Sequence, residues 1–317
     1  MDPLTHGLVG SAISAFSGTA VAIDNPLTIG AMLGAMSPDL DFVIRLFKDD
    51  AAYLEHHRGI SHSIPFLIGF SVVITLGLSF MGFEHFSFLQ TLLWTFIGAL
   101  SHTGLDILNS YGARLFIKKR KANLLTLYDP VITLVGFWFV LNGKNTIYEL
   151  VSGTLIISIY LLMRNNSKHN AGKRINAYFS KLYQVSDISV MPSLKAFYKW
   201  DFVVHTTEYD FVGQYSPLRL RNKLQIRHRM KMVDESYYNL FRSAIVGEKF
   251  SEFSPNLHLE VTKDSETHLI IIRAIDLRYF VKKNFMHHAT LIVDHDHKFV
   301  SSFIHPYNMN KAIPIYQ

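Results

Sequence analysis

Histidine and aspartate side chains interrupt an apolar stretch within the first 110 residues. The clearest pair is His102 and Asp106, because residues four positions apart on a helix share one face and can converge on one ion. Both fall inside the apolar segment 91–109, where an ionisable group is costly in lipid and therefore indicates a function. Taken alone, this pair is equally compatible with a His–Asp hydrogen bond between helices, so the interpretation depends on the other polar clusters.

Two carboxylates follow a proline that is typical of a helix start. Ser37-Pro38 suits an N-cap with proline at the first helical position, which puts Asp39 in the first turn and Asp41 about 200° around the helix. We therefore expect Asp39 to bind an ion, and Asp41 to bind a second ion, orient a histidine or act as a base. The alternative is a pair of ordinary first-turn acids that complement the helix dipole.

Three further histidines come from two other segments. His6 lies near the start, and His57 and His62 lie on either side of Gly59, which allows a bend that brings the two imidazoles together. A lone histidine is more often exposed or hydrogen-bonded than a ligand, but His and Asp residues from independent segments are harder to explain in that way. The predicted metal ligands are His6, Asp39, His57, His62, His102 and Asp106.

The chemistry of such a site is restricted by composition. The chain has no cysteine, so a metal must take nitrogen and oxygen ligands. Imidazoles and carboxylates without sulfur suit Zn²⁺, Mn²⁺, Fe²⁺ or Ni²⁺, and bridging aspartates permit one or two ions. A second metal tract is conceivable at residues 294–297 (Asp-His-Asp-His), but apolar runs on both sides favour a β-hairpin turn there.

The segments that carry these residues are apolar enough to be membrane helices. Two of them approach the ~20 residues that cross a bilayer, and two more are joined by an Asn-Gly-Lys-Asn turn. Two shorter ones fit short spans, re-entrant segments or buried core helices. These segments are residues 64–82, 91–109, 125–141 and 146–163, with the shorter ones at 7–22 and 26–36. The sequence therefore predicts, over residues 1–164, a mostly α membrane bundle of four to six apolar helices.

The charge changes in the second half of the chain. Residues 1–164 carry 10 Lys+Arg and 11 Asp+Glu, whereas residues 165–317 carry 21 and 14. Basic residues follow the segments that end near 109 and 163, and none lies in 83–90, which predicts a multi-pass protein of the cytoplasmic membrane with these loops inside the cell. From about residue 165, short apolar runs between turn residues predict a cytoplasmic α+β or mostly β accessory domain.

The basic balance of this second domain restricts its partners. A positive surface suits anionic lipid headgroups, and a protein partner bound through residues 165–317 is a further expectation. Nucleic acid is disfavoured, because no motif combines aromatic and basic residues specifically enough.

The ordered motifs of the first half resemble those of a known family. The resemblance is to the YdjM-like family of inner-membrane-associated, metal-dependent hydrolases, which is also described as LexA-binding. It covers roughly residues 1–165 and implies a membrane-embedded metal hydrolase. LexA binding does not transfer, because none of the matching residues carries it. These residues are Met1-Asp2, Thr5-His6, Ser37-Pro38-Asp39-Leu40-Asp41, His57-Arg58-Gly59, Ser61-His62-Ser63, Ser101-His102 and Asp106.

Together these features lead us to expect hydrolysis by a metal-activated water. Asp41 is the expected orienting group or base, and Arg58 is expected to bind an oxyanion or a phosphate, although an interfacial arginine that snorkels fits equally well. A site at headgroup depth favours a lipid-like or phosphorylated amphiphile as substrate. The main alternative is a non-enzymatic membrane regulator or scaffold with a partner-binding C-terminal domain. A metal or proton transporter fits less well, because the polar clusters gather at one face.

Overall fold

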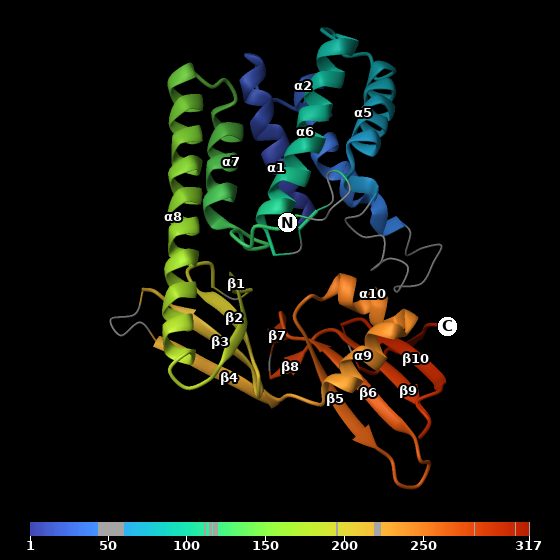
Figure 1. Ribbon diagram of the computed structural model, residues 1–317. Helices are drawn as coiled ribbons and strands as arrows, with labels where there is room; N and C mark the ends of the chain where they lie inside the picture. Colours follow the sequence, from blue (N-terminus) through green and yellow to red (C-terminus); the bar gives the residue numbers. More distant parts are fainter. Residues whose placement is uncertain are drawn as a thin grey trace. The chain divides into compact units, whose positions relative to one another are not determined.

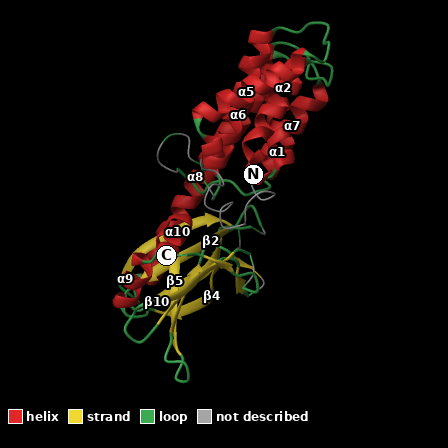
Figure 2. Ribbon diagram, turned by 90° about the vertical axis from the view of Figure 1, so that its right-hand side faces the viewer, coloured by secondary structure: helices red, strands yellow, loops and turns green. Residues whose placement is uncertain are grey.

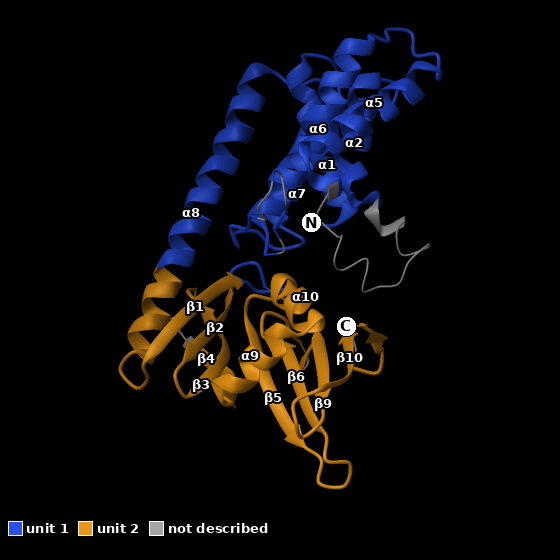
Figure 3. Ribbon diagram, turned by 45° about the vertical axis from the view of Figure 1, so that its right-hand side comes forward, with its two compact units in different colours: residues 1–43, 56–169, 192–198 blue, residues 44–55, 170–191, 199–317 orange. Residues whose placement is uncertain are grey.

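The computed structural model places the chain in two compact units (Figure 3). Unit 1 comprises residues 1–43, 56–169 and 192–198, and unit 2 comprises 44–55, 170–191 and 199–317. Helices make up the first and strands dominate the second (Figure 2). The structure describes residues 1–43, 60–110, 112–113, 116, 120–194, 196–218, 223–281, 283–307 and 309–316, without the side chains of 41–43, 60 and 223.

Several helices of unit 1 begin at an Asx-Pro pair. The side chains of Asp2, Asn25 and Asp129 accept backbone hydrogen bonds from the first turn, and a proline follows each. This combination fixes the start of a helix, because the cap satisfies free N–H groups and proline has none to satisfy. The elements are α1 (Pro3–Ser14), η1 (Ala15–Ser17), α2 (Pro26–Met36), η2 (Ser37–Val43), η3 (Ile60–His62), α5 (Ile64–Ser79), α6 (Phe88–Leu108), α7 (Pro130–Asn142) and α8 (Ile147–Phe179).

Glycines bring α1, α2 and α6 into close contact (Figure 1). A Cβ atom added at Gly98 would lie 2.1 Å from the carbonyl oxygen of Ala31, and one at Gly34 would lie 2.1 Å from that of Thr95. No side chain fits between the two backbones at these positions, so α2 and α6 pack in direct backbone contact. Because both helices end near polar clusters, this packing determines how closely those clusters approach.

Two glycines of α6 offer a test of this packing. We expect Gly98→Ala to lower the free energy of unfolding by about 1–3 kcal/mol, because its methyl group must push α2 away. Gly104→Ala, on the same helix, has nothing within 4 Å of the added Cβ and is expected to stabilise by about 0.5–1 kcal/mol through helix propensity. Thermal unfolding of the detergent-solubilised chain compares the two, and equal effects would contradict the close contact.

The predicted membrane bundle of four to six spans is wrong. Within the described residues, α8 is the single helix long and apolar enough to cross a membrane, and 11% of its apolar window is buried. The apolar helices α5 and α7 have 16 and 13 residues, fewer than the ~20 that a bilayer requires. Helix α6 has 21 residues, but its polar side chains make it less apolar than a span. The multi-pass topology predicted from the same segments loses its basis.

Among its described residues, unit 2 contains two larger sheets, a two-stranded antiparallel sheet (β7 and β8) and the helices α9 and α10 (Figure 1). The C-terminal part of α8 packs on the first sheet through Ala171, Ile175 and Phe179. Helices α9 and α10 pack on the second. The first sheet has the order β1 (Val185–Pro192), β2 (Trp200–Thr206), β3 (Tyr209–Ser216), β4 (Lys223–Lys231). The second has β11 (Ile313–Pro314), β10 (Phe299–His305), β9 (His288–Val293), β6 (Ile270–Asp276), β5 (Leu257–Lys263). The remaining elements are α9 (Glu235–Ser243), α10 (Ile245–Phe253), β7 (Phe280–Val281) and β8 (Asn284–Phe285).

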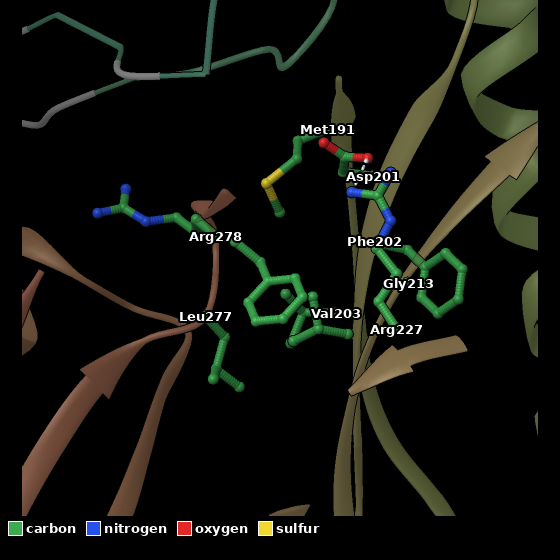
Figure 4. A pocket seen from close by; sticks show the side chains of 10 residues that line it. Met191, Asp201, Phe202, Val203, Gly213, Arg227, Leu277 and Arg278 are labelled. Carbon is green, nitrogen blue, oxygen red and sulfur yellow. Dashed lines mark ion pairs between the residues drawn. The ribbon is translucent and has the colours of Figure 1, made fainter. Parts of the chain in front are cut away.

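A small cavity lies between the two sheets (Figure 4). Asp201 and Arg227 form an ion pair at 3.8 Å on one side, and Leu277 and Arg278 lie on the other. Its volume of about 10 Å³ is that of a single water molecule. This cavity is therefore a packing feature and too small for an organic substrate.

Candidate metal centre

Helix α6 contributes two side chains to a polar cluster in unit 1. His102 and Asp106 lie one turn apart and are fully buried. The Nδ1 atom of His102 donates to the carbonyl oxygen of Ala35, at 2.6 Å. Because a carbonyl can only accept, the proton of a neutral His102 is on Nδ1, and its Nε2 presents a lone pair to the cluster.

Residues from two other segments meet this lone pair. The Nε2 atom of His102 lies 3.2 Å from Nε2 of His62 and 3.4 Å from Oδ1 of Asp39. Oδ2 of Asp106 lies 3.7 Å from Nε2 of His62 and 3.9 Å from Nε2 of His102. One ligand atom from each of the four residues lies within 4.8 Å of all the others. Helix α6, η2 and η3 thus bring two imidazoles and two carboxylates to one point.

His6 lies at the edge of this group. Its ring stacks on that of His102 with centroids 3.6 Å apart, and its Nε2 lies 3.4 Å from Oδ1 of Asp106. Both ring nitrogens are buried and have no hydrogen-bond partner in the part of the chain that the structure describes. Oδ1 of Asp106 also accepts from Asn109, at 2.7 Å, and from the amine of Met1.

Burial disfavours the protonated form of two of these histidines. It lowers the pKa of His6 to about 3 and also lowers the pKa of His62. Burial alone would raise the pKa of Asp39, but the neighbouring imidazole of His102 outweighs it and lowers that pKa. Neutral imidazoles and an ionised carboxylate are the forms that bind a metal ion.

The residues fit a divalent cation. A lone pair on His102 that faces two carboxylate oxygens is unfavourable unless a cation or a proton lies between them. Oδ1 of Asp39 is likewise buried and has no hydrogen-bond partner among the described residues. Two nitrogen and two oxygen donors are a usual set for Zn²⁺, Mn²⁺, Fe²⁺ or Ni²⁺.

The eight site residues expected from the sequence divide into three groups. The structure brings Asp39, His62, His102 and Asp106 together and places His6 beside them. His57 and Arg58 lie outside the described residues, and so does the side chain of Asp41, although its backbone belongs to η2. The individual roles of all eight stay predictions.

Unit 2 holds a second His/Asp group that the sequence did not reveal. Asp210 on β3 accepts from Nδ1 of His205 on β2, at 2.6 Å, and from Nδ1 of His258 on β5, at 2.7 Å. The carboxylate therefore joins the two sheets. Residues 294–297, the alternative metal tract, form the turn between β9 and β10, as the flanking apolar runs predict.

Comparisons with known proteins place both halves of the chain. A family model described as YdjM inner membrane protein matches residues 1–171, and one described as YfhP C-terminal alpha/beta plait domain matches residues 238–313. The chain is 27% identical over 321 residues to the uncharacterized protein YfhP of Bacillus subtilis (strain 168), covering 96% of this chain and 94% of that protein. No solved structure matches significantly. Because the first match includes more than half of the residues and all four clustered donors, the chain belongs to the YdjM inner membrane protein family.

Proposed function

We propose that this chain is a membrane-bound, metal-dependent hydrolase that acts on a lipid-like or phosphorylated amphiphile. The observation that carries the proposal is the convergence of Asp39, His62, His102 and Asp106, whose ligand atoms lie within 4.8 Å of one another. Such a group at the ends of packed helices is costly to bury unless an ion compensates it.

The buried side chains have different roles in such a site. Asp39, His62, His102 and Asp106 would hold the ion, which when bound lowers the pKa of a water and polarises the scissile carbonyl or phosphoryl group. His6 lies beside Asp106 with both ring nitrogens available, so it can complete the coordination or hold a proton. The donor set admits one ion, or two that share the carboxylates.

Two further residues have supporting roles in the proposal. Asp41 orients a histidine or acts as a base, and Arg58 binds a developing oxyanion or a phosphate. Both follow from the sequence, since they accompany the clustered donors in the chain.

Charge and hydropathy support the location. Helix α8 is mostly apolar up to Met163, and the basic residues Arg164, Lys168 and Lys173 follow within the same helix. Positive charge at one end of a span favours the cytoplasmic side. We therefore assign residues 165–317 to the cytoplasm, where their excess of basic residues suits anionic lipid headgroups and a protein partner.

One observation favours a second function. The amine of Met1 contacts Oδ1 of Asp106, so a positive group of the chain itself already compensates part of the buried charge. A cluster compensated in this way would hold the helices together in a non-enzymatic membrane regulator or scaffold. In that case the C-terminal domain would carry the activity by binding a partner.

Metal removal tests the proposed hydrolase. The detergent-purified protein, treated with a chelator, is expected to lose hydrolysis of a panel of ester and phosphoester amphiphiles by about a hundredfold or more. One of Zn²⁺, Mn²⁺, Fe²⁺ or Ni²⁺ should restore it, and elemental analysis follows the metal content. Hydrolysis that persists after complete metal removal would contradict the proposal, and inactivity with every ion would favour the regulator.

A further inference from the structure

An apolar cavity lies between α1, α6, α7 and α8 in unit 1. It has a volume of about 200 Å³ and is lined by aliphatic side chains, among them Val9, Ile13, Leu105 and Val135. A second hollow of about 360 Å³ adjoins it and shares Phe16, Thr154 and Ser158. We name the two together the α1–α8 groove. Its size suits part of a hydrocarbon chain.

The hydroxyl groups that line the groove have no free O–H donor for an occupant. The Oγ1 atom of Thr154 donates to the carbonyl oxygen of Leu150, and the Oγ atom of Ser158 donates to that of Thr154. The donors of these hydroxyls are thus used within α8, and the other lining side chains are aliphatic or aromatic. A polar ligand would lose its hydrogen bonds to water there, whereas an apolar chain would gain from leaving water.

One face of the N-terminal helix connects this groove to the metal centre. His6, Val9, Ile13 and Phe16 follow one another at intervals of three or four residues, so they lie on one side of α1 and its continuation η1. Val9 is about 4.5 Å from His6 along the helix axis, and Phe16 lies about 10 Å beyond Val9. The groove therefore begins one helical turn from the histidine beside the metal centre.

Helix α6, which carries His102 and Asp106, also connects the groove to the metal centre. On α6, Leu105 lines the groove, and the next residue, Asp106, belongs to the metal centre. Metal centre and groove thus share the walls of α1 and α6. A molecule with a polar end at the first and an apolar tail in the second would contact both.

The opposite wall of the groove is the candidate membrane span. Thr154, Ile157 and Ser158 of α8 line it, while Ile156 and Ile159 on the same helix are exposed. A groove that opens along such a helix faces the chains of bilayer lipids.

From these contacts we propose that the α1–α8 groove binds the acyl chain of a membrane lipid whose head group lies at the metal centre. This inference rests on the proposed hydrolase for the role of the head group, whereas the chain site itself depends only on the groove. A lipid that is both held and hydrolysed in this way is a substrate recognised by its tail as well as by its head.

Crosslinking tests the chain site independently of catalysis. The full-length protein is placed in vesicles that contain phosphatidylglycerol with a diazirine on one acyl chain, illuminated, and digested for mass spectrometry. We expect crosslinks at Val9, Ile13 and Leu105. Thr154→Trp should fill the groove and reduce them at least tenfold, whereas Ile156→Trp, on the exposed side of α8, should leave them unchanged. Ser158→Trp is a second filling variant should the first not fold.

The outcomes separate this inference from the proposed function. Crosslinks in the groove of an inactive His102→Ala protein would support the chain site alone. Crosslinks confined to Ile156 and Ile159, or unchanged by both filling variants, would show lipid around the helix only and would overturn the inference. If hydrolysis is found, shortening the acyl chain by two methylenes should lower kcat/KM about tenfold in the wild type. The Thr154→Trp variant should lose that dependence.

Discussion

Replacing His102 by alanine is expected to remove the bound metal and to lower hydrolysis about a thousandfold, the equivalent of ~4 kcal/mol of transition-state stabilisation. His102 is the residue at which the cluster meets, since its Nε2 lies 3.2 Å from His62 and 3.4 Å from Asp39. Its loss also leaves two carboxylates side by side without the imidazole between them. Elemental analysis of the purified variant, beside an assay of the amphiphile panel, measures both effects.

Two further variants make this prediction specific. Asp39→Ala removes a carboxylate that has no hydrogen-bond partner at Oδ1 among the described residues, and it should reduce the metal content in the same way. His85→Ala changes an exposed histidine of unit 1 and should retain both metal and activity. Unchanged metal content in both His102→Ala and Asp39→Ala would reject this set of ligands.

The sequence predicts which residues form the candidate site better than it predicts how these residues are arranged in space. The pair His102 and Asp106 follows from helix periodicity alone. The approach of His62 to His102 depends on packing over 40 positions, which no local pattern contains. Glycines were the available signal, because Gly34 and Gly98 allow the contact between α2 and α6 that puts the Ala35 carbonyl beside His102.

The number of membrane spans could not be predicted because hydropathy does not locate helix ends. Residues 125–141 are mostly apolar and contain one charged residue, Asp129, yet the helix begins only at Pro130, after the Asp129 cap. Leu125 is buried outside the helix, and Arg164 donates to the carbonyl oxygen of Leu124. An apolar run can therefore include a packed loop, which shortens the helix below the length of a span.

The β-rich character of the second unit follows from short alternating runs, but its polar interior does not. His205, Asp210 and His258 are separated by 5 and 48 positions, and each is surrounded in sequence by ordinary strand residues. A strand pattern indicates which residues alternate, not which buried polar groups face each other across two sheets. The contacts among these three residues are therefore the feature of unit 2 that the sequence predicted least.

Replacing Asp210 by alanine is expected to lower the local stability of unit 2 by about 3 kcal/mol or more. The carboxylate is fully buried and accepts a hydrogen bond from each of two histidines on different strands. Without it, His205 and His258 lose the acceptor that compensates their burial. Hydrogen exchange of peptides that cover β2, β3 and β5, measured on the full-length protein, reports this change. Asp296→Ala removes an exposed ion-paired aspartate of the same unit and should change it by less than about 0.5 kcal/mol.

The pKa shifts of His205 and Asp210 predict how the effect of Asp210→Ala on stability changes with pH. Burial alone would lower the pKa of His205, but its hydrogen bond to Asp210 outweighs this and raises that pKa. Burial alone would raise the pKa of Asp210, but the bonds from both histidines lower it. The His205 contribution is present below about pH 6.5 and is lost as the pH rises through the raised pKa, while the Asp210 contribution is present above about pH 4 and is lost on acidification. The stability difference between wild type and Asp210→Ala should therefore be larger at pH 5.5 than at pH 8.5, and an equal difference at both pH values would contradict an ion pair between His205 and Asp210.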